Sequence, residues 1–259
     1  NDTATTEIYT KPSSAASDVY KRQGQGFTAI PVFLHRRFRH GFIFINTSKG
    51  IAEPKDLNGK KIGLKTYQAT AILYLRGLLA SEYGVDLTSI DWVTELEEEI
   101  PFDAPPGIRI TRAPDGSDIG EMLAEGELDA VLHPDVIAPI LRGDERVGRL
   151  FENYRAEEEA YYRRTGIFPI MHATAIRNEI LEEHPWIANN LAQAFDKAKF
   201  AAYRRMNNPR VVPLAWFLDE WDSQRKLMGP DPWENGLTRP NRNNLETLIG
   251  CILYTSTSQ

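Results

Sequence analysis

The sequence contains a single cysteine, Cys251, among its 259 residues. One cysteine can form neither a disulfide within the chain nor a metal site built from several thiolates. No uncharged apolar run approaches the roughly 20 residues that a membrane-spanning helix requires, so we predict no transmembrane helix. Acidic residues outnumber basic ones, 36 against 30, and the net charge of −6 argues against a broad nucleic-acid-binding surface.

Several sequence signatures of enzymes are also missing. The chain has no G-x-G-x-x-G, no Walker A loop and no G-x-S-x-G motif. The sequence therefore indicates neither the nucleotide-binding sites that the first two motifs form nor the nucleophile elbow of a hydrolase. What is present is an ordinary globular composition, with 42% hydrophobic and 25% charged residues. This composition excludes a largely disordered protein.

The two ends of the chain differ from its middle. Residues 1–23 are rich in Ser, Thr, Ala and Asp, show no helical or strand period, and contain no apolar segment of a secretory signal. They and residues 251–259 resemble the translated adaptor sequence found at the ends of metagenomic reading frames, and a native disordered tail is the alternative. We therefore expect 1–23 and 251–259 to be non-native or disordered, with the native sequence beginning near Gly24.

Between the ends, short apolar runs alternate with helical patterns. The expected strands are 27–34, 41–46, 60–64, 91–95, 108–112, 128–132 and 169–176. The expected helices are 67–83, 118–124, a helix capped by Asp135 that ends at Leu141, 156–164, 187–203 and 212–228. Pro31 should bend the first strand or confine it to an edge, and Gly84 should end the first helix. The alternation from 60 to 142 predicts the α/β class, with a mostly parallel sheet covered on both faces.

Positive charge is concentrated between the first two expected strands. Residues 34–40, LHRRFRH, contain three arginines and two histidines. Because a guanidinium presents a planar fork of donors to a carboxylate or phosphate, this cluster predicts an anion-binding site. A solvated loop with ordinary surface arginines is the alternative.

A second candidate site for an anion lies at Thr66, Tyr67 and Gln68, where the strand 60–64 turns into a helix. Unpaired amide groups and the helix dipole favour an anion at such a place. Ligands of open α/β sheets also bind beyond the carboxyl ends of the strands. Thr66 could instead serve only as the helix cap.

Three histidines, His40, His133 and His172, fall at strand ends or within strands where a ligand would bind. A lone histidine in a strand is more often a core residue than a catalyst. Three imidazoles could also bind a metal, but the close spacing of an H-E-x-x-H site is absent and we predict no metal. The acidic run from Glu95 to Glu99 is interpreted as a solvated face or loop.

Five segments carry a resemblance to a known family: AIPVFLHRRFRH with GFIFIN, DLNGKKIGLKTYQATAILYLRGLLASEYGVDLTSIDWV, GELDAVLHP, GIFPIMHATAIRNEILEEHPW and GPDPWENGL. In these segments the chain resembles the 4,5-dihydroxyphthalate decarboxylases, of the type 2 periplasmic-binding-protein superfamily, over about residues 26–250. The resemblance implies two α/β lobes joined by two crossover strands, with the ligand in the cleft between them. It places lobe 1, incomplete at its start, at 24–54 plus 166–250, and the inserted lobe 2 at 55–165.

The resemblance further implies a cytoplasmic decarboxylase that acts on an aromatic dicarboxylate without a cofactor. The implied residues are Arg37, Arg39, Thr66, Tyr67 and Gln68 for substrate binding, and His40, His133 and His172 for moving protons. The alternative left open is a periplasmic solute-binding protein that passes an organic anion to a transporter permease without turnover. A pyrimidine-synthesis relative is disfavoured, because the chain lacks the cysteine-rich segment of that group.

Overall fold

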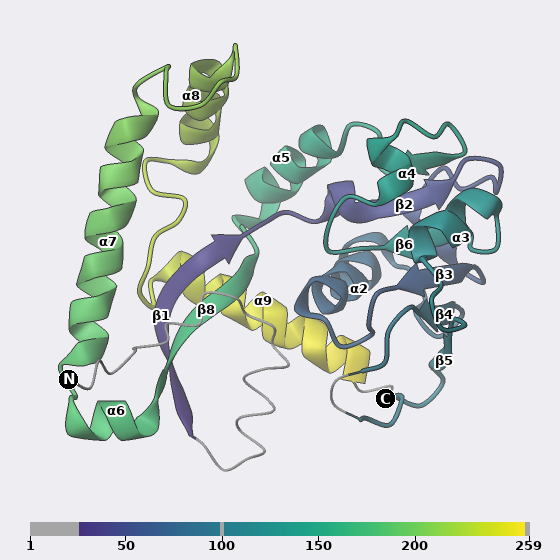
Figure 1. Cartoon of the computed structure of the whole chain (residues 1–259), viewed down its shortest axis with the longest axis horizontal. Helices are drawn as coiled ribbons and strands as arrows, with labels where there is room; N and C mark the ends of the chain where they lie inside the picture. The colour runs from purple at the N-terminus through teal and green to yellow at the C-terminus, as the bar shows by residue number, and fades with distance from the viewer. Residues whose placement is uncertain (1–25, 99–100, 257–259) are drawn as a thin grey trace. The chain divides into compact units, whose positions relative to one another are not determined.

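Figure 1 shows the computed structural model of the chain, which describes residues 26–98 and 101–256. The chain divides into two compact units. Unit 1 comprises the residues up to Arg36 together with Ile170–Asn241, and unit 2 comprises Arg37–Pro169 and the residues from Arg242 onward. The expected tail 1–23 lies outside the described residues. The expected inserted lobe, 55–165, lies within unit 2, which also includes 37–54.

Unit 2 is built on a six-stranded sheet of order β5-β4-β3-β6-β2-β7. The strands are β2 (Ile43–Asn46), β3 (Lys61–Leu64), β4 (Asp91–Thr94), β5 (Arg109–Arg112), β6 (Ala130–Leu132) and β7 (Val147–Arg149). β3, β4, β5 and β6 run parallel to one another, whereas β2 runs antiparallel to both β6 and β7. The α/β class and the mostly parallel block within 60–142 are therefore confirmed.

Helices cover both faces of this sheet, because successive side chains of a strand point to opposite sides. Ile43 and Ile45 of β2 belong to one core cluster with apolar residues of α2 (Thr70–Tyr83). Phe44, between them, belongs to a second cluster with apolar residues of α3 (Ile119–Glu125). Burial on both faces explains why β2 and β6 are continuous apolar runs in the sequence.

Two helix ends lie at the predicted residues Gly84 and Asp118, whereas the helices expected to begin at 67 and 212 begin at Thr70 and Phe217. Gly84 ends α2 in the left-handed conformation at φ 65°, where a side chain would be strained. Asp118 caps α3 by accepting a hydrogen bond from the amide of Glu121 at 3.0 Å. The cap predicted at Asp135 is wrong, because α4 (Ala138–Leu141) begins after Ile137 and the backbone of Asp135 contacts a histidine instead.

Unit 1 contains an antiparallel ribbon of β1 (Phe27–Arg36) and β8 (Ile170–Arg177) (Figure 1). The register is irregular between Ile30 and His35, around the proline that was expected to bend this strand. Apolar residues of the ribbon pack against α6 (Asn178–Glu183) and α7 (Ile187–Met206), and α8 (Phe217–Met228) follows. None of the helices in the described ranges combines the length and apolar character of a bilayer span.

Arg36 joins the segment before α9 (Arg239–Ser256) to this ribbon. Its guanidinium is buried and donates from Nη2 to the carbonyl oxygen of Glu234 at 3.0 Å and to the side chain of Asn241. The amide of Gly236 also donates to Pro31 O at 2.7 Å. Arg36 is therefore a structural member of the arginine cluster.

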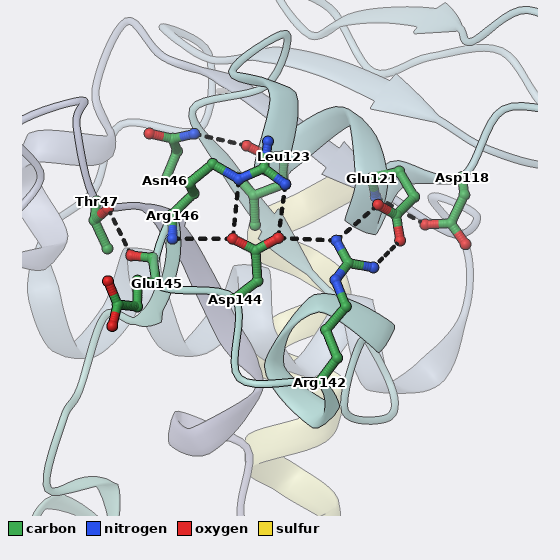
Figure 2. Close-up of polar contacts among 9 residues, drawn as sticks. All are labelled: Asn46, Thr47, Asp118, Glu121, Leu123, Arg142, Asp144, Glu145 and Arg146. Carbon is green, nitrogen blue, oxygen red and sulfur yellow. Dashed lines mark hydrogen bonds and ion pairs between the residues drawn. The ribbon is translucent and has the colours of Figure 1, made fainter.

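Two arginines of unit 2 converge on the carboxylate of Asp144 (Figure 2). Arg146 donates to it from Nε at 2.9 Å and Nη2 at 2.7 Å, and Arg142 donates from Nη2 at 2.9 Å while also binding Glu121 of α3. These charge-assisted bonds hold the pKa of Asp144 well below its usual range. These four side chains bind one another, and their bonds connect the turn between α4 and β7 to α3. We therefore assign the network a structural role.

The end of the chain contacts α2. Cys251 of α9 is buried against Gly77, where an added Cβ would lie 2.3 Å from Cys251 Sγ and 3.0 Å from its Cα. Residues 251–256 of the expected non-native or disordered tail 251–259 belong to α9, and 257–259 lie outside the described residues. The glycine permits this close approach of the two helices.

We predict that Gly77→Ala destabilises the chain. The added methyl overlaps the backbone and side chain of Cys251, and overpacking of this kind costs about 1–3 kcal/mol. Each kcal/mol corresponds to about 2–4 °C in Tm for a chain of this size. Gly250→Ala is the matched control, because open space surrounds Gly250 on α9. Equal thermal unfolding of the two variants would contradict the contact.

Candidate functional site

Four segments of unit 2 meet at one edge of its sheet. The register places Leu64, the last residue of β3, beside the ends of both β4 and β6. Leu132, the last residue of β6, in turn lies beside Ile43, the first residue of β2. The residues that follow β3, β4 and β6 therefore share an edge with those that precede β2. Because ligands of α/β proteins bind beyond the carboxyl ends of the strands, this edge is the candidate site.

Arg37, Arg39 and His133 form one group at this edge. Arg39 Nη1 donates to Pro134 O at 2.8 Å, and Arg37 Nη1 lies 3.9 Å from Asp135 Oδ1. His133 Nδ1 lies 2.8 Å from Asp135 O and 3.0 Å from Asp135 N, so this backbone fixes the imidazole. Nε2 then remains as the nitrogen able to exchange a proton with a ligand.

The two arginines differ in their exposure to solvent. The side chain of Arg37 is 43% exposed, whereas Arg39 is 4% exposed. Burial, together with the charge of Arg37, lowers the pKa of Arg39 to about 10. Arg37 is thus available to a ligand, and Arg39 holds the turn that carries His133.

His40 lies in the interior of unit 2, within the 3₁₀ helix His40–Phe42. It is 1% exposed, and the rings of Tyr161, Phe151 and Tyr83 surround it at centroid distances of 5.4, 5.5 and 6.2 Å. Neither of its nitrogens has a hydrogen-bond partner among the described residues. Burial lowers its pKa to about 4, so the ring is neutral near pH 7 and packs as a core residue.

His172 belongs to unit 1. The register of β1 and β8 pairs it with His35, and the two ring centroids are 4.7 Å apart. The structure therefore groups His133 with the arginines of unit 2 and places His172 in a cross-strand histidine pair. Within the described residues, no group of three or more potential metal ligands is found.

The amides of Tyr67 and Gln68 bind a carboxylate that belongs to the chain itself. Tyr67 N donates to Oε1 of Glu98, and Gln68 N donates to Oε2 of the same residue at 3.2 Å. Glu98 is therefore bound, whereas the side chain of Glu97 is 82% exposed, so the interpretation of the acidic run as a solvated loop holds for Glu97 and not for Glu98. α2 begins after Ala69 without a side-chain cap, so Thr66 does not serve as the cap.

A buried arginine stands beside these amides. Arg76 of α2 is 2% exposed, and its guanidinium carbon lies 3.4 Å from the ring centroid of Tyr67. Arg76 Nη2 donates to Tyr67 O at 3.0 Å, while Nε and Nη1 have no partner among the described residues. Burial lowers the pKa of Arg76 to about 10. Sequence reasoning missed Arg76, although a charged residue within the apolar pattern of a buried helix is a signal that could have found it.

Glu158 of α5 (Tyr154–Thr165) is a second residue that sequence reasoning missed. Its Oε1 accepts a hydrogen bond from the amide of Gly41 at 3.4 Å. Burial raises the pKa of its carboxyl group to about 7, against the opposing effects of backbone hydrogen bonds and the charge of Arg39. A carboxyl group of this kind can hold or release a proton near neutral pH.

We predict that Glu158→Gln raises stability at alkaline pH. A pKa raised from 4.5 to about 7 on folding gives a contribution to stability that is fully present below pH 4.5 and is lost as the pH rises through about 7. The Tm of the variant relative to the native chain should therefore rise by several degrees between pH 5 and pH 8, at about 2–4 °C per kcal/mol.

Glu159→Gln provides the control for this measurement. Ion pairs with Arg155 and Arg163 lower the pKa of Glu159, so its contribution is present at pH 8 and is lost in acid. At pH 8, Glu159→Gln should therefore be less stable than the native chain. A pH-independent difference for Glu158→Gln would contradict the burial of an ionising carboxyl group.

Comparison with known proteins gives the class of this α/β chain. No protein-family model matches it. It is 36% identical over 219 residues to a 4,5-dihydroxyphthalate decarboxylase from Comamonas testosteroni, covering 81% of this chain and 66% of that protein. It is 34% identical over 143 residues to one from Pseudomonas putida, covering 53% and 55%. The resemblance is thus confirmed: the chain is a homologue of proteins named 4,5-dihydroxyphthalate decarboxylase and spans 55–66% of their length.

Solved structures are similar at a lower level. The periplasmic aliphatic sulphonate binding protein SsuA from Escherichia coli has a TM-score of 0.46 and 13% identity, covering 91% of this chain and 70% of that one. Protein AF1704 from Archaeoglobus fulgidus has a TM-score of 0.47 and 14% identity, covering 91% and 75%. Similarity at this level carries no argument about ligand or activity.

Proposed function

We propose that this chain carries the site of a decarboxylase that acts on an aromatic dicarboxylate such as 4,5-dihydroxyphthalate. The observation that supports the proposal is the sheet edge, which brings together an exposed Arg37, an oriented His133 and the carboxylate-binding amides of Tyr67 and Gln68. The names of the curated relatives point in the same direction. The proposal includes no cofactor.

The chemistry requires proton transfer at two positions of the substrate. Each carboxyl group of 4,5-dihydroxyphthalate has a hydroxyl para to it, and removing the proton of that hydroxyl raises the electron density at the carbon that bears the carboxylate. This carbon takes up a proton, its bond to the carboxylate breaks, and carbon dioxide leaves while the electron pair restores the aromatic ring. In the net reaction the dicarboxylate consumes one proton and gives a monocarboxylate and carbon dioxide.

The geometry supports distinct roles for the residues of the edge. Arg37 holds the retained carboxylate, because its guanidinium fork is exposed. His133 moves a proton through Nε2, and Arg39 keeps the turn of His133 in place. Glu158 is a further group that can hold a proton near neutral pH. His172, which lies in unit 1, receives no role at this edge, and His40 receives none because its ring is enclosed.

The proposed partner is a small aromatic carboxylate, and the proposed location is the cytoplasm. A solute-binding protein with the same anion site would instead be periplasmic and would contact a transporter permease. Cell fractionation of the full-length protein separates these two locations.

The activity is tested by incubating the chain with 4,5-dihydroxyphthalate and following carbon dioxide and the monocarboxylate by mass spectrometry. We expect turnover, and we expect His133→Gln to reduce kcat by about 10²–10⁴-fold, with little change in affinity. His184→Gln is the control, since His184 lies at the exposed end of α6. Binding without release of carbon dioxide would favour the solute-binding alternative, and absence of both would contradict the proposal.

Arginine substitutions test the anion site by calorimetry. Arg37→Ala should weaken binding of the dicarboxylate by about 1.5–3 kcal/mol, the range for a charge-assisted hydrogen bond. Arg37→Lys should recover only part of this, because an ammonium lacks the fork. Arg39→Ala should lower both Tm and affinity. Arg146→Ala is the control, because it removes an arginine that is bound to Asp144. Unchanged affinity in Arg37→Ala would mean that residues 34–40 are only a solvated loop.

A further inference from the structure

The carboxylate of Glu98 binds Tyr67 and Gln68 in the manner expected of a free carboxylate. Each of its oxygens accepts a hydrogen bond from one backbone amide, and Oε2 also accepts one from Gln68 Nε2 at 3.3 Å. A planar group with two oxygens fits two neighbouring amides in this way. The two amides therefore suit an anion that presents two oxygens, as a carboxylate does.

The backbone brings Glu98 to this place. Beyond the ends of β3 and β4, Glu95 N donates to Leu64 O at 2.8 Å and Leu96 N donates to Lys65 O at 2.9 Å. The pairing of the two strands thus continues to within two residues of Glu98. The side chain is held close to the amides by the sheet itself.

Two rings and a buried cation keep the amides in position. The ring of Tyr67 contacts the guanidinium of Arg76 and stacks with the ring of Phe102, whose centroid is 5.7 Å away at an interplanar angle of 14°. Arg76 is almost fully buried and has two nitrogens without a partner among the described residues, so its charge is not neutralised by an ion pair there. Its positive charge next to Tyr67 favours an anion at the neighbouring amides.

We propose that Glu98 is an internal ligand of this site and that a substrate carboxylate binds by displacing it, so that Glu98 sets the apparent affinity of the edge for carboxylates. This inference rests on the proposed function, because the substrate carboxylate is that of the proposed aromatic dicarboxylate. A tethered competitor acts at an effective concentration of about a millimolar or more. If Glu98 occupies the amides for about nine-tenths of the time, the apparent affinity of a free carboxylate falls about tenfold.

Acetate is the probe for this inference, with amide NMR of the full chain as the readout. In Glu98→Gln, acetate should shift the amide signals of Tyr67 and Gln68 and should bind about tenfold more tightly than in the native chain. Glu97→Gln is the matched control. It removes the same charge one residue away, from a carboxylate that pairs with Arg112 at 2.5 Å, and it should behave as the native chain does.

The inference is overturned if Glu98→Gln binds acetate no more tightly than Glu97→Gln, or if acetate leaves the signals of Tyr67 and Gln68 unchanged in Glu98→Gln. Should Glu98→Gln fail to fold, Glu98→Asp is used instead. The shorter side chain cannot span both amides, so its acetate affinity should exceed that of the native chain. Acetate binding requires no turnover. The NMR experiment therefore tests the role of Glu98 independently of the carbon dioxide release that tests the proposed function.

Discussion

Charges that are removed from water determine the shape of the sheet edge. Arg39, Arg76 and Glu158 are each buried to an extent that shifts their pKa, and a charge in such a place is costly unless polar groups surround it. In each case a main-chain group is among the partners: Pro134 O for Arg39, Tyr67 O for Arg76 and the amide of Gly41 for Glu158.

Each of these contacts fixes one turn at the edge. The turns at 40–42, 67–68 and 133–135 are therefore held by side chains that come from other parts of the chain. This explains how short irregular segments can present donors in a defined arrangement. It also means that the residues available to a ligand, such as Arg37 and His133, depend on neighbours that do not touch it.

Most strands and several helix ends could be predicted from the sequence because their signals are local, whereas β7, three residues without an apolar run, was not expected. A strand buried on both faces is a continuous apolar run, and Gly84 and Asp118 mark helix ends through their own backbone or side chain. The meeting of the arginine loop with His133 was also predictable in outline, since strand ends share an edge. The different roles of the exposed Arg37 and the buried Arg39 could not be predicted, because the burial of Arg39 depends on tertiary packing.

Glu98 and Glu158 could not be assigned from the sequence for a related reason. Their partners lie 30 and 117 positions away, respectively, and each glutamate stands in a run of acidic residues where the pattern does not distinguish one from the next. Asp135 illustrates the opposite error. A plausible local cap was predicted there, whereas its backbone is engaged by His133 two residues earlier.

The contact of Cys251 with Gly77 of α2 makes the thiol a chemical probe of the position of α9. The thiol is the only one in the sequence, and burial raises its pKa to about 11, so it reacts slowly while α9 stays in place. Alkylation of the folded chain therefore requires that α9 first leave Gly77. The rate of labelling then measures how often this helix opens, a local motion that the overall unfolding transition does not report.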